Sequence, residues 1–306
     1  MLNSSRTPML KVSLLALLLG ACAPAVPAQP LASTAQTDAA GWAAACGEWD
    51  DWDKPGPPFR IHGNTWYVGT CGIAAFLVTG DDGHILIDGG TEAGAGPIAA
   101  NIAALGFDIA DVKTILFSHE HFDHVGGLAE LQRLSGARLL SSPEAAQVMA
   151  TGVSDPADPQ AGMHEAFAPV RVDGTVAHNE AVEMGDLRLV AIGTPGHTPG
   201  AISWWWRSCD DAGGCRVVNY LDSLSPISRD DYRFSDHPEY VARFREGLDR
   251  LKVTACGIVM TPHPSASDLH TRIAAGTLHD PTGCRLSAGG IEARLDARLA
   301  KEESER

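Results

Sequence analysis

Three histidines and one aspartate stand within six consecutive positions, in the segment Ser-His-Glu-His-Phe-Asp-His. This segment directly follows an apolar run, 112–117, that is typical of a β-strand. Alternate residues of an extended chain point the same way, so His119 and His121 can reach one metal ion. Asp123 and His124 come where the chain turns into a helix and can face a second ion. Imidazole and carboxylate are good zinc ligands, so the pattern predicts two zinc ions at the end of a strand.

The composition restricts the class of protein and its partners. The chain has 306 residues, of which 44% are apolar and 20% charged, as expected for a soluble globular protein with one or two domains. Its formal net charge is −15. Residues 1–28 hold two basic and no acidic residues, so the remainder is still more acidic. This charge argues against nucleic acid or an anionic membrane surface as the partner.

The N-terminus has the pattern of a signal peptide. Arg6 and Lys11 precede the apolar stretch Val12–Leu19, which is too short to span a membrane. Two cleavage sites remain open. The Leu-Gly-Ala-Cys segment that ends at Cys22 resembles a lipoprotein box and would place a lipid anchor there, whereas Val-Pro-Ala, ending at Ala28, resembles an ordinary site. We expect plain export and a periplasmic location.

The chain divides into three parts. We expect a signal segment at 1–28, a loose N-terminal arm at 29–56 that is rich in Ala, Gly and Pro, and a folded domain at 57–306. In that domain short apolar runs separated by Gly and Asp turns alternate with helical patterns, such as the helix expected at Val125–Leu134. This alternation predicts an α/β sandwich with helices outside two sheets. Residues 150–163 lack periodicity and predict a surface loop.

Six cysteines follow Cys22, an even number that suggests disulfides in an exported chain. Fifteen pairings are possible for six cysteines, and buried free thiols are the alternative. Pairing of neighbours is favoured, because a turn-rich loop separates Cys209 from Cys215. The expected pairs are Cys46–Cys71, Cys209–Cys215 and Cys256–Cys284.

Two further histidines follow strands in the second half of the chain. His197 lies in Thr-Pro-Gly-His-Thr-Pro-Gly after the apolar run 187–192, and His263 lies in Thr-Pro-His-Pro after the run 255–259. Each is presented just past the end of a strand, as in the first cluster, so both are candidate ligands. The remaining histidines lack this setting and are interpreted as structural or surface residues: His62, His84, His164, His178, His237, His270 and His279.

These motifs, together with Tyr-Leu-Asp-Ser-Leu-Ser-Pro at 220–226, make the chain resemble the metallo-β-lactamase superfamily, and within it subclass B3. The resemblance spans roughly residues 45–300. It implies a four-layer αββα sandwich with two zinc ions per chain. It also implies hydrolysis of the β-lactam amide bond of penicillins, cephalosporins and carbapenems by a zinc-bound hydroxide, which would confer antibiotic resistance. The implied partner is a small-molecule substrate.

The resemblance assigns roles to particular residues. By that likeness one zinc is held by His119, His121 and His197, and the other by Asp123, His124 and His263. Asp123 would also orient the hydroxide, and Glu120 would point away from the metals.

The resemblance also implies a substrate site. Ser223 and Ser225 would bind the substrate carboxylate near the second zinc, and Gln160 would lie near the substrate carbonyl. Either serine could instead cap a turn before Pro226.

Two other functions remain open from the sequence. A lactonase or thioesterase of the same fold would carry a bridging aspartate, and Asp222 stands beside the expected place. A zinc-binding protein without catalytic activity would keep the ligands but close the site. The Trp-Trp-Trp run at 204–206 is interpreted as large rings on both faces of a buried strand.

Overall fold

Two β-sheets form the centre of the molecule. The computed structural model describes Met1, residues 38–47 and residues 51–306. In this part of the chain one sheet has seven strands in the order β1-β2-β3-β4-β5-β6-β7. They are β1 (Phe59–His62), β2 (Thr65–Tyr67), β3 (Phe76–Gly80), β4 (Gly83–Ile87), β5 (Val112–Leu116), β6 (Arg138–Ser141) and β7 (Val172–Thr175).

The second sheet has five strands in the order β12-β11-β10-β9-β8 over the same described residues. They are β8 (Ala181–Met184), β9 (Leu187–Gly193), β10 (Ile202–Cys209), β11 (Cys215–Tyr220) and β12 (Ile258–Met260). Strands β8 to β11 pair antiparallel, and β12 pairs parallel with β11. Parallel pairs β4–β5 and β11–β12 bring the carboxyl ends of strands together, and loops at such ends can carry the metal-binding side chains.

The main core lies between the inward faces of the two sheets. Trp204 and Trp206 alternate on one face of β10 and are 0% and 1% exposed, beside Phe76 and Tyr220. Trp205 points to the other face and packs with the helices outside that sheet. The tryptophan run therefore has the structural role expected from the sequence.

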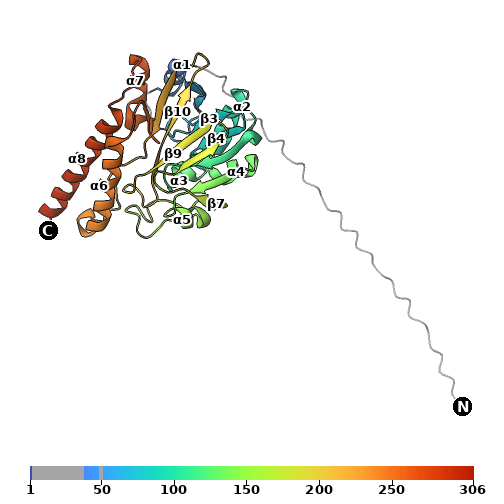
Figure 1. Cartoon of the computed structure of the whole chain (residues 1–306). Helices are drawn as coiled ribbons and strands as arrows, with labels where there is room; N and C mark the ends of the chain where they lie inside the picture. The colour runs from blue at the N-terminus through green and yellow to red at the C-terminus, as the bar shows by residue number, and fades with distance from the viewer. Residues whose placement is uncertain (2–37, 48–50) are drawn as a thin grey trace. The chain divides into compact units, whose positions relative to one another are not determined.

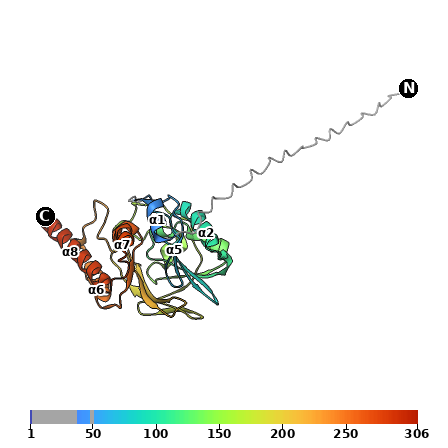
Figure 2. The ribbon, with the colours of Figure 1, turned by 90° about the horizontal axis from the view of Figure 1, so that it is seen from above.

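Helices cover the outer face of each sheet. On the first sheet the outer core includes residues of α2 (Ala95–Ala104), α4 (Leu128–Ser135) and α5 (Ala146–Thr151). On the second sheet, α6 (Pro238–Val253) and α8 (Gly283–Ser304) lie side by side. In Figure 1, α6 and α8 lie on one side of the sheets and α2 and α4 on the other, and Figure 2 again shows α6 and α8 on the side opposite α2. The four-layer αββα sandwich is confirmed.

The segment expected as a loose arm contains an ordered helix, α1 (Ala39–Cys46). Asp38 caps it by accepting a hydrogen bond from Gly41 N at 2.7 Å. Trp42 is fully buried against Phe59 and Tyr67, and α1 also contacts α7 (Leu269–Ala275). The expectation of a loose arm is wrong for these residues, because one large apolar ring anchors a short alanine-rich helix to the core.

The helix expected at Val125–Leu134 is divided into α3 (Phe122–Val125) and α4. Gly126 and Gly127 stand between them. A Cβ atom on Gly127 would lie 2.3 Å from Gly89 O, so the chain passes too close to the loop after β4 for any other residue.

The six cysteines form the three neighbouring pairs favoured by their spacing: Cys46–Cys71, Cys209–Cys215 and Cys256–Cys284. None of the helices in the described part of the chain has the length and apolar character needed to cross a membrane. The expected signal segment and the lipid anchor at Cys22 lie outside the described residues.

Candidate metal centre

The histidine cluster lies where β5 ends and α3 begins. His119 and His121 occupy the loop between them, with His121 in extended conformation at the N-cap of α3. Asp123 and His124 lie in the single turn of α3. The backbone thus changes from extended to helical between the two pairs, as the sequence predicted.

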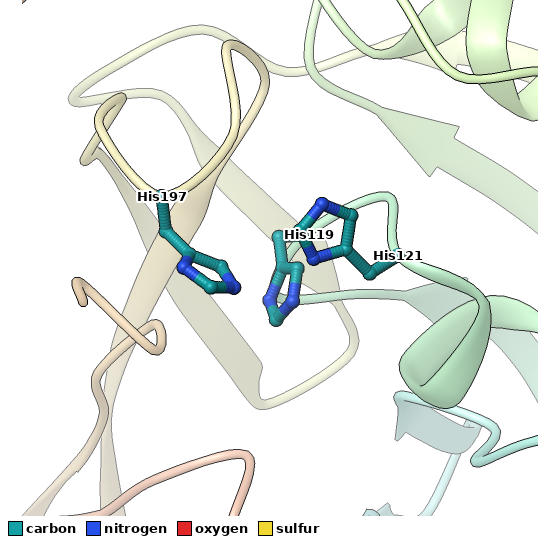
Figure 3. A group of neighbouring side chains, drawn as sticks. All are labelled: His119, His121 and His197. Carbon is teal, nitrogen blue, oxygen red and sulfur yellow. The ribbon is translucent and has the colours of Figure 1, made fainter. Parts of the chain in front are cut away.

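His197 joins His119 and His121 to form the first group. His197 lies in the loop between β9 and β10, far from the other two in the sequence. The nearest ligand atoms of the three rings lie within 4.8 Å of one another, and all three side chains are buried. Figure 3 shows the rings from the two loops turned toward one another.

Each ring of the first group has an outer partner on one of its two nitrogens. Asp222 Oδ1 lies 2.8 Å from His119 Nδ1, and Asp158 Oδ2 lies 2.9 Å from His121 Nε2. His197 Nδ1 lies 3.0 Å from both the carbonyl oxygen and the hydroxyl of Ser225. Hydrogen bonds to the outer nitrogen fix the tautomer and the ring orientation of a metal-binding histidine.

The nitrogens that remain fit a metal ion. They are His119 Nε2, His121 Nδ1 and His197 Nε2. His119 Nε2 is fully buried and has no hydrogen-bond partner among the described residues, which is costly for a polar atom unless a ligand binds it. Three neutral imidazoles facing one point are a typical donor set for zinc. The residues present therefore fit the metal that the sequence implies.

The second group is centred on the carboxylate of Asp123. His124 Nε2 lies 3.0 Å and His263 Nε2 lies 3.3 Å from the same oxygen, Asp123 Oδ2. Ligand atoms of His119, Asp123 and His124 also lie within 4.8 Å of one another, so His119 stands between the two groups. All six side chains expected as ligands therefore meet in one place.

The buried surroundings set the protonation of these groups. Burial, strengthened by the neighbouring histidines, holds the pKa of His119 well below its usual value, and burial does the same to the pKa of His197. Burial alone would raise the pKa of Asp123, but His124 and His263 outweigh it and hold that pKa well below its usual value. Neutral imidazole and ionised carboxylate are the forms that bind a metal.

Glu120 links the two loops that carry the first group. Its carboxylate accepts hydrogen bonds from Thr198 Oγ1 at 2.6 Å and from Gly200 N at 2.9 Å. Burial raises the pKa of Glu120. The side chain thus points away from the metal groups, as the sequence predicted, and it ties the loop of His197 to the loop of His119.

A cavity of about 580 Å³ opens over the two groups. Its walls include side chains of both metal groups, Trp52, the segment after β11 and one face of α8. The two serines of the expected substrate site line it. The hydroxyl oxygen of Ser223 is buried and has no hydrogen-bond partner within the described chain. Between the two serines Leu224 has a φ of 55°, a left-handed conformation that is strained for leucine.

The region expected as a surface loop at 150–163 contributes to the site. Asp158 and Gln160 are 2% and 5% exposed, and Gln160 lines the cavity. His164, interpreted as structural or surface from the sequence, also lines the cavity, and its ring lies 5.1 Å from that of His121. The surface-loop expectation is wrong for these residues, because the loop folds inward to pair Asp158 with His121.

The outer partners of the candidate ligands were not predicted from the sequence in this role. Asp88 follows β4 as the histidine cluster follows β5, and it accepts hydrogen bonds from Ser118 and Tyr220. Its place after an apolar run is a signal that could have pointed to it. Asp158 lies in an irregular loop and has no comparable signal. The sequence suggests Asp222 only as a bridging ligand, whereas in the structure its Oδ1 lies 2.8 Å from the outer nitrogen of His119.

Comparison with known proteins identifies the family. The profile of the metallo-β-lactamase superfamily matches residues 68–212. The solved MIM-2 metallo-β-lactamase is 52% identical, with a TM-score of 0.83, and the match covers 88% of this chain and 100% of that one. The chain belongs to the metallo-β-lactamase superfamily. It is also similar to MIM-1 from Novosphingobium pentaromativorans, at 47% identity and a TM-score of 0.84, over 87% of this chain and 98% of that one.

The likeness to subclass B3 is confirmed as well. MEM-A1, a subclass B3 metallo-β-lactamase from a soil metagenome library, is 39% identical with a TM-score of 0.79, over 84% of this chain and 100% of that one. Curated relatives carry another name. A hydroxyacylglutathione hydrolase of Bradyrhizobium sp. (strain ORS 278) is 34% identical over 111 residues, 36% of this chain and 34% of that protein. The chain thus spans about a third of the length of that curated relative.

Proposed function

We propose that this metallo-β-lactamase-fold hydrolase cleaves the β-lactam amide bond with two zinc ions per chain and so confers antibiotic resistance. The main support for the proposal is that the similarity to solved metallo-β-lactamases extends over nearly the whole of those proteins. Solved metallo-β-lactamases at 39–52% identity are covered over 98–100% of their length, including the C-terminal region. The hydroxyacylglutathione hydrolase is covered over only 34% of its length.

The position of Asp222 supports the same choice. A bridging aspartate would have to turn its carboxylate toward both metal groups. One oxygen of Asp222 instead lies 2.8 Å from the outer nitrogen of His119, and the other accepts a hydrogen bond from Leu224 N at 3.1 Å. With Oδ1 at this short distance from the outer nitrogen of His119, Asp222 acts as a support of His119 in this proposal.

The six side chains divide into two sets in the proposed enzyme. His119, His121 and His197 hold one zinc, and Asp123, His124 and His263 hold the other. When bound, zinc supplies Lewis acidity and lowers the pKa of water to about 7, which provides a nucleophile at neutral pH. Asp123 lines the cavity, so its carboxylate can accept a hydrogen bond from the attacking water and orient it.

Two serines and one amide bind the substrate in this proposal. The buried hydroxyl of Ser223 donates a hydrogen bond to the ring carboxylate. Ser225 accepts from His197 Nδ1, which leaves its own O–H to donate to the same carboxylate. The amide nitrogen of Gln160 is buried without a partner among the described residues and can donate to the substrate carbonyl.

Hydrolysis of a carbapenem by the zinc-loaded protein tests the proposal. Turnover that stops with a chelator and returns with zinc is expected. A protein that binds two zinc ions yet leaves penicillins, cephalosporins and carbapenems intact would disprove it, and would favour a zinc-binding protein without catalytic activity.

Thioester hydrolysis is the second candidate, favoured by the names of the curated relatives. A lactonase of the same fold is distinguished by the same experiment. The relative kcat/KM values for a carbapenem, a hydroxyacylglutathione thioester and an acyl-homoserine lactone separate the three. A preference for the thioester or the lactone by more than tenfold would replace the proposed substrate.

We propose that the enzyme acts in the periplasm. The charge and apolar pattern of residues 1–28 supports export, and the three disulfides fit an oxidising compartment. N-terminal sequencing and mass analysis of the protein isolated from the periplasm distinguish cleavage after Ala28 from lipid attachment at Cys22.

A further inference from the structure

One wall of the cavity belongs to α8, the last helix of the chain. Cavity-lining residues recur along it at helical spacing: Leu286, Ser287, Gly290, Ile291 and Arg294. Residues three and four positions apart share one face of a helix, so these side chains form a continuous stripe. The metal ligands and the two serines line other walls of the same cavity. Binding of metal ions does not explain why this stripe of α8 lines the cavity.

Arg294 provides an unpaired positive charge on that wall. Two of the other three cations of α8 have ion pairs, Arg298 with Glu302 and Lys301 with Glu305, whereas Arg285 has none among the described residues and does not line the cavity. No hydrogen bond or ion pair joins Arg294 to any residue that the structure describes. In a chain with a formal charge of −15, a guanidinium that lines a cavity without a carboxylate beside it is suited to bind an anion.

Gly290 leaves open space, called here the notch, on the cavity wall one turn from Arg294. Glycine in the middle of a helix is unfavourable relative to alanine, and packing gives no reason for it here. A Cβ atom on Gly290 would have no atom within 4 Å in the described structure. The missing side chain falls between Leu286 and Arg294, one turn from each. Leu286 is 59% exposed and supplies apolar surface beside the notch.

We infer that Leu286, Gly290 and Arg294 form an outer subsite for the acyl side chain of the substrate, which selects side chains with an apolar part and an anionic group. This inference rests on the proposed β-lactamase function. The apolar part packs on Leu286 in the space left by Gly290, and the guanidinium of Arg294 donates hydrogen bonds to the anion. The ring carboxylate stays with Ser223, so the subsite recognises a second negative charge.

Three penicillins separate the parts of the subsite. 6-Aminopenicillanic acid has no acyl side chain, benzylpenicillin has an apolar one, and carbenicillin adds a carboxylate to that of benzylpenicillin. Arg294→Ala should lower kcat/KM for carbenicillin relative to benzylpenicillin by about three- to fivefold, as expected for an exposed ion pair. Arg294→Lys should restore most of this ratio, and added salt should reduce it in the wild type.

Arg285→Ala is the matched control. Arg285 lies on the same helix, is exposed and has no ion pair with a described residue, but it does not line the cavity. Its substitution should leave the ratio unchanged. Gly290→Leu should lower kcat/KM for both side-chain-bearing penicillins relative to 6-aminopenicillanic acid, whereas Gly289→Leu, at the neighbouring glycine outside the cavity wall, should not. These ratios do not depend on the amount of folded protein.

The outcomes separate this inference from the proposed function. If the zinc-loaded wild type hydrolyses the penicillins but the carbenicillin ratio is the same in wild type and Arg294→Ala, the subsite is overturned and the β-lactamase proposal stands. If the zinc-loaded wild type hydrolyses no penicillin, cephalosporin or carbapenem, the β-lactamase proposal fails and the subsite fails with it. If it hydrolyses a carbapenem but no penicillin, the β-lactamase proposal stands and the subsite for the acyl side chain of penicillins is overturned. A drop in the ratio for Arg294→Ala but not for Arg285→Ala supports the subsite.

Discussion

The two groups of candidate metal-binding side chains are held in position by different means. In the first group each histidine has an outer partner, Asp222 at 2.8 Å, Asp158 at 2.9 Å and Ser225 at 3.0 Å. In the second group His124 Nε2 and His263 Nε2 lie 3.0 and 3.3 Å from one oxygen of Asp123, inside the group. The carboxylate of Asp88 lies 3.6 Å from His124 Nδ1.

This difference has a consequence for metal binding. Outer partners fix the rings of the first group in the orientation that a metal needs, so little ordering remains to be done on binding. The second group is arranged around a carboxylate that must itself become a ligand, so its internal contacts have to change. We therefore expect the first group to bind zinc more tightly than the second.

The largest expected effect is the loss of a ligand from the first group. His121→Ala should abolish hydrolysis and lower the zinc content, because the remaining two imidazoles cannot hold the ion in place. Metal analysis and carbapenem turnover on the same sample measure both. His178→Ala, at an exposed histidine outside the metal groups, is the control and should change neither. Full activity with two zinc ions in His121→Ala would show that His121 is not a ligand.

The outer partners give a second and smaller effect. Asp158→Asn should weaken zinc binding at the first group by about 10–100-fold, since it removes the charged partner of His121. Asp88→Asn, which changes the more distant carboxylate of the second group, should weaken zinc binding less. Competition with a chromophoric chelator measures each affinity, and thermal melting controls for damage to the fold. Equal losses in the two variants would contradict the difference between the groups.

The sequence could point to the candidate ligands because metal chemistry restricts residue type and spacing. His119, His121, Asp123 and His124 lie in one short segment, and His197 follows a strand with Gly and Pro on both sides. The two-sheet architecture was also predictable, since strand and helix patterns alternate along the domain. The candidate ligands and the two-sheet architecture both follow from patterns of neighbouring residues, which are visible in a single sequence.

The supports of the ligands could not be predicted in the same way. Asp158 reaches His121 only because an irregular loop folds over the site, and no periodicity marks such a loop. The helix at Ala39–Cys46 depends on the burial of Trp42 in a core made by distant strands. Tertiary contacts of this kind are set by the whole fold and leave little trace in the local sequence.

Ser223 and Ser225 differ in whether they also contact a metal group. Ser223→Ala should raise KM for carboxylate-bearing substrates by about tenfold with little change in kcat, because this hydroxyl is proposed to bind ground and transition states alike. Ser225→Ala should also lower kcat, since Ser225 holds His197 of the first group. Steady-state kinetics on one cephalosporin distinguishes the two. A pure kcat loss in Ser223→Ala would contradict its proposed role.

The smallest expected effect on catalysis comes from the Cys256–Cys284 bridge. Cys256 precedes β12, whose loop carries His263, and Cys284 lies in the first turn of α8. Cys256→Ser should lower the free energy of unfolding by about 3 kcal/mol, because the bridge closes a long loop. Zinc affinity of the second group should hardly change, since contacts with Asp123 arrange that group.

Cys209→Ser is the matched control for the bridge. Its pair spans a separation of 6 residues instead of 28, so its loss should lower stability less. Thermal melting under oxidising conditions measures the stability of both variants, and competition with a chelator measures their zinc affinity. Cys256→Ser could instead lower the zinc affinity of the second group as strongly as Asp158→Asn lowers that of the first. The second group would then depend on outer supports too, and the difference between the two groups would disappear.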